Sequence, residues 1–150
     1  MTATFTLTDN EGTVTEFTKP DASATTWQVS STLMEGVSNS TVTVVSETVA
    51  VDGKTLARPK RIIAPTSAVT TAGCAADPAT KGCRALEFVY ATSTTATAGT
   101  FGDVAGQVKE VRLWSTAPGA AAATSKPCRP TSTTTPTGCA RHGTRRSTRR

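Results

Sequence analysis

The chain has 150 residues, a formal net charge of +5 and a pI near 9.3. Six of its arginines lie in residues 127–150, and without that segment ten bases stand against eleven acids. The composition therefore excludes a basic body, so binding to nucleic acid or to an anionic membrane would rest on the C-terminal segment alone. No apolar run approaches the length of a membrane-spanning helix.

Threonine is the commonest residue, with 32 copies, whereas leucine occurs only five times. Threonine is β-branched and favours strands. Alternation of apolar and polar residues predicts strands, in chain order, at 4–9, 13–18, 25–31, 41–52, 54–57, 60–64, 84–92 and 107–115. No segment of helical length shows a 3.6-residue apolar period. The predicted fold is all-β, made of antiparallel hairpins.

Turn residues support two of these hairpins. Gly12 supplies the positive φ that a turn after 4–9 needs, and Asp52-Gly53 is a strong hairpin signal between 41–52 and the returning strand. Pro59 and Pro65 are expected to confine that returning strand to an edge or to break it in two. On the 41–52 strand, Val42 and Val44 are expected on the face opposite that of Val45, Val49 and Val51.

Two long loops are predicted, at 66–82 and 93–106. Cys74 and Cys83 bracket the end of the first loop, where a disulfide would join them in an oxidising setting. Two unpaired thiols are the alternative. A metal site is not expected, because the chain has no C-x-x-C motif and its only histidine, His142, lies far along the tail.

The composition divides the chain into three parts. Residues 1–116 form a β-rich segment, 117–126 form an Ala/Thr low-complexity linker, and 127–150 form an Arg/Thr/Pro-rich tail with no large apolar residue. Such a tail is predicted to be disordered.

None of the candidate catalytic or ligand residues forms a convincing constellation. His142 lies among arginines with no apolar residue to hold it. Asp9, Glu11 and Asp103 lack the spacing of a calcium loop and are interpreted as turn residues. The small basic cluster consists of Lys54, Arg58, Lys60 and Arg61. It lacks interleaved aromatics and is interpreted as a solvated strand face. We therefore expect a non-enzymatic protein without cofactor.

Two binding functions remain as alternatives. A β-sandwich binding or adhesion module would need two sheets and a cluster of exposed aromatics, for which Trp27, Tyr90 and Trp114 are the candidates; each is expected to pack inward. Non-specific nucleic-acid binding would act through the tail, and deleting 127–150 should then remove all salt-sensitive binding.

Three stretches carry a resemblance to a known family. Residues 5–17, F-T-L-T-D-N-E-G-T-V-T-E-F, resemble the strand-turn-strand units of bacterial RHS/YD-repeat proteins. Residues 82–97 and 102–114 resemble the segment just before the YD repeats in large RHS proteins. The resemblance covers roughly residues 4–126.

A YD repeat of the form Y-x-Y-D-x-x-G-R-L should follow, where the tail stands instead. With the reading frame moved back one base, the codons of residues 131–145 allow Y-V-Y-D-D-T-D-R-L-R-E-A-W-D-P. This resembles the missing repeat except for its usual glycine. The tail is therefore interpreted as a frameshifted YD repeat, and a genuine basic binding tail is the alternative. The coding DNA distinguishes them, because a wobble base that prevents Tyr or Trp contradicts the frameshift.

The resemblance implies an architectural role. RHS/YD-repeat proteins are long β-sheet ribbons that spiral into a hollow shell, often around a C-terminal toxin, and are exported or surface-associated. The chain would then be a structural fragment whose partners are the rest of the shell or the enclosed toxin. Poor autonomous stability and exposed sheet edges are expected. Residues 1–10 show no signal-peptide pattern, and a strand beginning almost at Met1 predicts a truncated start.

Overall fold

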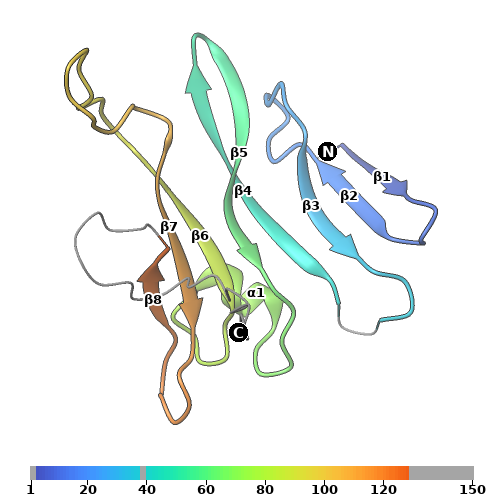
Figure 1. Cartoon of the computed structure of the whole chain (residues 1–150). Coiled ribbons are helices and arrows are strands. Elements are labelled where there is room, and N and C mark those ends of the chain that lie inside the picture. The colour runs from blue at the N-terminus through green and yellow to red at the C-terminus, as the bar shows by residue number, and fades with distance from the viewer. Residues whose placement is uncertain (1–2, 38–39, 129–150) are drawn as a thin grey trace, which may run out of the picture.

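The computed structural model describes residues 3–37 and 40–128. They form one antiparallel sheet of eight strands whose order in space follows the chain, from β1 to β8 (Figure 1). The strands are β1 (Thr4–Thr8), β2 (Val14–Thr18), β3 (Gln28–Leu33), β4 (Val42–Val51), β5 (Lys54–Ile63), β6 (Ala85–Tyr90), β7 (Val108–Ser115) and β8 (Thr124–Pro127). The prediction of an all-β fold of antiparallel hairpins is confirmed. The tail from residue 129 onward lies outside the described residues.

The two predicted turns have the expected backbone. Gly12 has φ +79°, and Asp52 and Gly53 have φ +49° and +73°. Positive φ at both central residues belongs to the hairpin turn whose twist matches that of the flanking strands. The turn also sets the register of the longest ladder, in which Val51 pairs with Lys54.

The returning strand neither breaks at Pro59 nor lies at an edge, because β5 is paired with both β4 and β6, so both expected outcomes are wrong. β5 is continuous, with a bulge between the pairs Val45–Arg61 and Ser46–Pro59. Ala57, two residues earlier, turns its N–H and C=O away from β4, toward Thr26 and Gln28. Because Pro59 has the same orientation, its missing N–H costs no bond to β4.

Two short elements lie where the sequence predicted none. Helix α1 (Thr71–Ala76) falls in the predicted 66–82 loop, and β8 begins inside the predicted linker and ends in the predicted tail. Six residues are too few to show a helical period. The α1 N terminus is capped by Thr70, whose Oγ1 accepts a hydrogen bond from the Gly73 N–H at 3.1 Å.

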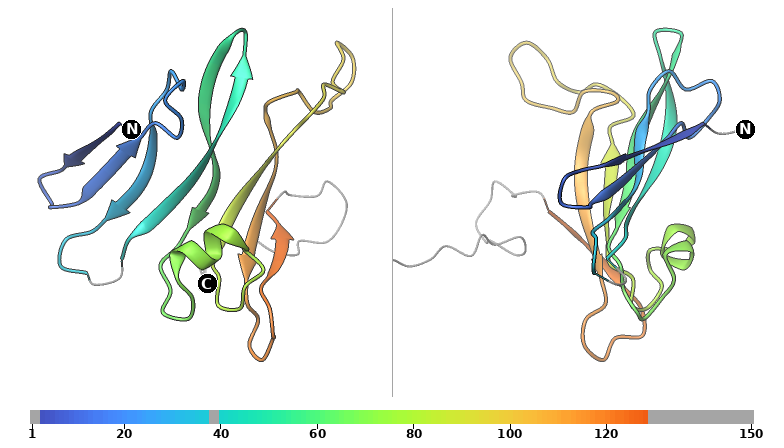
Figure 2. Two further views of the ribbon diagram at one scale, coloured as in Figure 1. Left: turned by 180° about the vertical axis from the view of Figure 1, so that it is seen from behind. Right: turned by 90° about the vertical axis from the view of Figure 1, so that its right-hand side faces the viewer.

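One face of the sheet, which we call the helix face, carries α1 (Figure 2). Among residues 3–37 and 40–128, the hydrophobic core cluster lies beneath this helix. Its buried members are Ile63, Cys74, Cys83, Ala85 and Ala123, with Val45, Val69, Ala75 and Trp114 packed against them. Alanine and cysteine side chains are small, so this core buries far less apolar area than a core of large aliphatic side chains.

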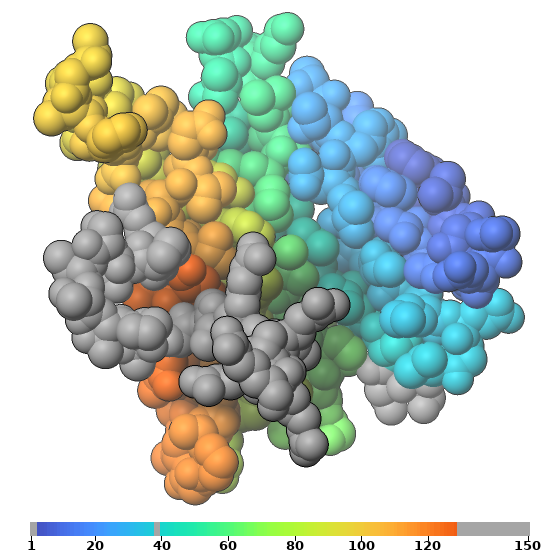
Figure 3. Space-filling view, in the orientation of Figure 1, coloured from blue at the N-terminus to red at the C-terminus, as the bar shows by residue number. Residues whose placement is uncertain are grey.

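The other face, which we call the open face, carries no described helix or second sheet. Cross-strand register places on it a series of apolar side chains: Phe5, Leu7, Phe17, Val29, Val42, Val44, Ile62, Leu86, Phe88, Val111 and Leu113. The predicted division of the valines of β4 between two faces agrees with this register. Figure 3 shows this side of the molecule in space-filling form, with β1 to β3 beside β4 and β5.

Candidate functional site

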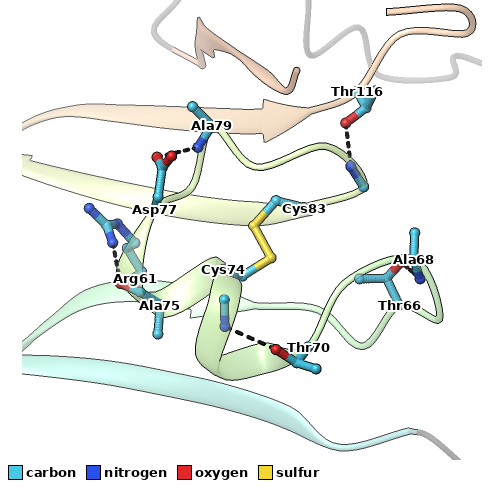
Figure 4. The surroundings of a disulfide bond; sticks show 12 residues. Arg61, Thr66, Ala68, Thr70, Cys74, Ala75, Asp77, Ala79, Cys83 and Thr116 are labelled. Atoms are coloured by element: carbon cyan, nitrogen blue, oxygen red, sulfur yellow. Dashed lines mark hydrogen bonds between the residues drawn. A yellow bond between two sulfur atoms is a disulfide. The ribbon is translucent and has the colours of Figure 1, made fainter. Parts of the chain in front are cut away.

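The loop before β6 is held to the sheet by a disulfide. Cys74 in α1 is joined to Cys83, with a Cα–Cα distance of 5.5 Å, and both residues are fully buried (Figure 4). Of the two alternatives left open by the sequence, the structure has the bridge. Gly82 N–H donates to Thr116 Oγ1 at 2.8 Å, and Ala123 N–H donates to Ala79 C=O at 2.8 Å. The loop is thus tied to the segments on both ends of the β7–β8 turn.

A polar network joins α1 to the helix face. Arg61 donates to the Ala75 carbonyl at 2.8 Å, and its Nη2 lies 3.2 Å from Glu87 Oε1. Glu87 Oε2 accepts from Trp114 Nε1 at 3.0 Å. The Arg61 and Glu87 side chains are only 13% and 14% exposed. In such surroundings an ion pair needs these additional hydrogen bonds to offset its desolvation. The network positions the helix. Both carboxylate oxygens of Glu87 are engaged, one with Arg61 and the other with Trp114.

Arg112 extends the network toward solvent. Its Nε lies 2.9 Å from Glu110 Oε1, and its Nη1 lies 4.0 Å from Glu87 Oε2. The hydrogen bond to Glu110 raises the pKa of Arg112, which therefore stays charged at all physiological pH values.

The predicted basic cluster is divided among several partners. Arg58 Nη2 lies 2.7 Å from Glu47 Oε1, Lys60 Nζ lies 3.9 Å from Glu47 Oε2, and Arg61 faces Glu87. The interpretation as a solvated face is wrong for Arg61, which is largely buried. Paired cations of this kind offer little attraction to a phosphate backbone.

Tyr90 packs against the same strand. Its hydroxyl donates to the Pro59 carbonyl at 2.6 Å, and the Arg58 guanidinium lies 3.7 Å from the centre of its ring. Burial raises the pKa of Tyr90, although the positive charge of Arg58 acts in the opposite direction.

A Tyr90→Phe substitution should change the response to alkaline pH. A raised pKa means that the folded chain holds the phenolic proton more tightly than the unfolded chain. The associated stability is complete below about pH 10 and is lost as the pH rises through the raised pKa. We expect Tyr90→Phe to lower the free energy of unfolding by about 1 kcal/mol at pH 7, because the hydrogen bond is lost. The variant should also lose less stability at alkaline pH than wild type. Tyr90 is the only tyrosine, so absorbance at 295 nm reads its titration directly; a midpoint at or below 10 contradicts the prediction.

An exposed aromatic cluster lies on the open face near β1. The rings of Phe5 and Phe17 stack with centroids 4.8 Å apart, and Trp27 meets Phe5 edge-on at 4.9 Å. Phe5 is 45% exposed and Trp27 38%. The expectation that Trp27 packs inward is therefore wrong, whereas Tyr90 and Trp114 are half-buried. The alternation of 4–9 and 13–18 contained the signal, because antiparallel pairing brings Phe5 opposite Phe17.

The open face is hollowed between β4 and β7. A depression of about 550 Å³ is lined by Val42, Ile62, Ala64, Arg84, Ala85, Leu86, Leu113, Trp114 and Ser115. Its floor is mostly apolar, and Arg84 is the only charged side chain in this lining. Such a surface suits contact with another apolar surface better than chemistry on a polar substrate.

The remaining candidates have structural roles or lie outside the described residues. Asp9 accepts hydrogen bonds from the Glu11 and Thr13 N–H groups, as a turn aspartate does. Asp103 pairs with Lys109 at 2.9 Å, far along the chain from Asp9. His142 is outside the described residues. Among residues 3–37 and 40–128, no group of three or more acidic, His or Cys side chains could hold a metal.

No protein-family model, curated protein or solved structure matches the chain. Within the described residues, no helix has the length and apolar character needed to cross a membrane.

Proposed function

We propose that the chain is a structural segment of an RHS/YD-repeat shell, a piece of β-sheet ribbon without catalysis of its own. The observation that carries this proposal is the open face of a single sheet. Strands that follow one another in chain order, each hydrogen-bonded to the next, are what a growing ribbon requires. The partners are the remainder of the shell or its enclosed toxin.

The open face supports an assembly role through its chemistry. Leu86 and Leu113, near its centre, are 36% and 37% exposed, and Leu7 at its margin is 58% exposed. Contiguous apolar surfaces of this kind mark contacts with other surfaces. In a spiralling ribbon each unit buries such a face only against its neighbours.

The uneven distribution of the core supports the same role. The five residues of the main cluster come from β5, the 66–84 region, the start of β6 and the turn just before β8. No residue of β1, β2 or β3 is buried. The N-terminal strands are therefore held by backbone pairing and half-exposed side chains. A sheet built in this way needs neighbours for full stability.

The proposal is tested on the isolated 150-residue chain. We expect binding of the dye ANS and a broad thermal change in far-UV circular dichroism, with no single cooperative transition. Leu86→Thr with Leu113→Thr should lower ANS binding, whereas Thr6→Ser, which leaves the apolar residues in place, should not. A sharp cooperative transition without ANS binding counts against a dependent segment. A downstream YD-repeat array in the shifted frame of the DNA would support the family assignment.

The aromatic cluster favours a second candidate, a surface that binds sugar rings. A β-sandwich needs two packed sheets, and the described residues form one, so such binding would use the sheet surface itself. Stacking on Trp27 would change its fluorescence during titration with oligosaccharides, read in a Trp114→Phe background. An unchanged spectrum excludes this candidate.

The tail provides the third candidate, and the structure refines its test. Because β8 includes Pro127, deletion should begin at residue 129. If the tail binds DNA through its six arginines, the logarithm of the association constant should fall with the logarithm of the salt concentration, with a slope no steeper than about −5. The deletion should then remove the binding. Binding retained by the deleted chain would place the site elsewhere.

A further inference from the structure

The two edges of the sheet differ in what they offer to another strand. At β8, Cys128 N–H donates to Val111 C=O at 2.6 Å, which fixes which residues of this strand face β7. Ser125 and Pro127 face outward by this alternation. Because proline has no N–H, Ser125 supplies the only outward backbone donor of β8. With Lys126 also present, this edge is protected against further pairing.

The β1 edge has no such protection. Lys19 N–H donates to Ala3 C=O and Asp9 N–H donates to Thr13 C=O, so alternate residues of β1 bond to β2. The N–H and C=O groups of Thr4, Thr6 and Thr8 therefore point away from the sheet. The strand, T-F-T-L-T, contains no charge and no proline, and all of its residues are exposed.

We propose that β1 is a self-association edge, through which two copies of this chain pair antiparallel in a two-fold register centred on Thr6. In this register Thr4 lies opposite Thr8 of the second copy, and Phe5 lies opposite Leu7 of the second copy. The two Thr6 residues, one from each copy, lie opposite each other at the two-fold axis. The pairs that exchange backbone hydrogen bonds are then those of Thr4, Thr6 and Thr8. The outward N–H and C=O groups of Thr4, Thr6 and Thr8 in one copy then meet the same outward groups of the other copy, so all of them are hydrogen-bonded.

The side chains favour a second copy as the occupant. Phe5 and Leu7 both lie on the open face, and they meet in the non-hydrogen-bonded pairs, where opposing side chains are closest. They are 45% and 58% exposed in the single chain. Pairing covers part of this surface and continues the apolar open face across both copies. The interface is isologous, as two-fold symmetry requires. It goes beyond the proposed function, since it depends only on the β1 edge.

The two-fold centre allows a sharp test. Thr6 lies opposite Glu16 on β2. A lysine at position 6 would therefore face a carboxylate within its own chain but another lysine in the dimer. Like charges directly opposite each other disfavour strand pairing. Thr6→Lys should thus leave the single chain folded and disrupt the dimer.

The experiment measures molar mass by light scattering and sedimentation for the full chain. We expect wild type to shift with concentration from 15.4 kDa toward twice that mass, with no dimer band on a non-reducing gel. Thr6→Lys and Thr6→Glu should each raise the dissociation constant at least about tenfold, and an equimolar mixture should restore the dimer through opposite charges. Thr124→Lys, the same charge change on β8, should dimerise like wild type. Circular dichroism should be unchanged in Thr6→Lys and Thr124→Lys. Thr6→Glu places a second carboxylate opposite Glu16 and should weaken the pairing of β1 with β2 in the single chain, which the lysine of the mixed dimer offsets.

Three results would overturn the proposal. Wild type could stay at the single-chain mass up to a protein concentration of about 0.1 mM, at which a dimer with a micromolar dissociation constant is mostly formed. Thr6→Lys could dimerise as well as wild type. The mixture of Thr6→Lys and Thr6→Glu could remain monomeric, which would mean that the substitutions damage the strand and do not report on an interface. Each is distinguishable from failure of the shell proposal, which rests on the open face and is tested by ANS binding and by the coding DNA.

Discussion

Replacing Cys74 and Cys83 with serine should loosen the packed half of the sheet. The disulfide closes a short loop, with a sequence separation of 9, and a loop of this size gives about 2.5–3 kcal/mol from the reduced entropy of the open chain. Both sulfurs also belong to the main core, so serine would place hydroxyls in an apolar site. We expect backbone amides of β6 to exchange about 100-fold faster in deuterated buffer.

The control is Cys128→Ser, which makes the same chemical change outside the bridged loop. It should leave the exchange of β6 within about threefold of wild type, since substitutions away from buried features stay within about 0.5 kcal/mol. Exchange in β1 and β2 should be fast in every variant, because those strands contain no buried residue. Equal acceleration by the Cys74/Cys83 and Cys128 variants would show that the bridge does not stabilise this region.

Removing the Glu87 carboxylate should have the second large effect. Glu87→Ala would leave the Arg61 guanidinium, 13% exposed, without its counter-charge and Trp114 Nε1 without its acceptor. Breaking a largely buried pair in this way costs about 3 kcal/mol. Because Arg61 also holds the Ala75 carbonyl, α1 should lose protection together with β6. Hydrogen exchange at both elements measures the effect.

Glu110→Ala is the matched control for Glu87. Glu110 contacts Arg112 on the exposed side of the same network, where the two side chains are 25% and 39% exposed. Exposed pairs contribute at most about 1 kcal/mol. The double replacement Arg61→Met with Glu87→Leu should cost less than Glu87→Ala alone, since it leaves no unpaired charge. A larger effect of Glu110→Ala than of Glu87→Ala would contradict this account of the network.

Local sequence signals were sufficient for most strands and failed where stability comes from distant contacts. The alternation in 84–92 and 107–115 predicted β6 and β7 because a half-buried strand imposes a period of two on its own residues. Helix α1 was missed since its six residues are held by the Thr70 cap and by a bridge to Cys83. β8 was missed because its T-S-K-P sequence is polar, and its pairing with β7 supplies the hydrogen bonds.

The candidate surfaces show the same limit. Arg61 and Glu87 are 26 residues apart in sequence, and nothing local indicates that they pair beneath a helix. Phe5, Phe17 and Trp27 belong to three segments whose register brings the rings together. Composition did show that the body of the chain has almost no net charge. In the structure two of its arginines, Arg58 and Arg61, are paired with glutamates.

Local sequence patterns specify antiparallel hairpins with one apolar face on most strands, because strand alternation and turn geometry are properties of neighbouring residues. Which face α1 covers, which face stays open and which edge remains available at β1 follow from the folded arrangement of the strands. Those outcomes depend on cross-strand register and on the direction of individual N–H and C=O groups, which are set by pairing between residues far apart in the chain.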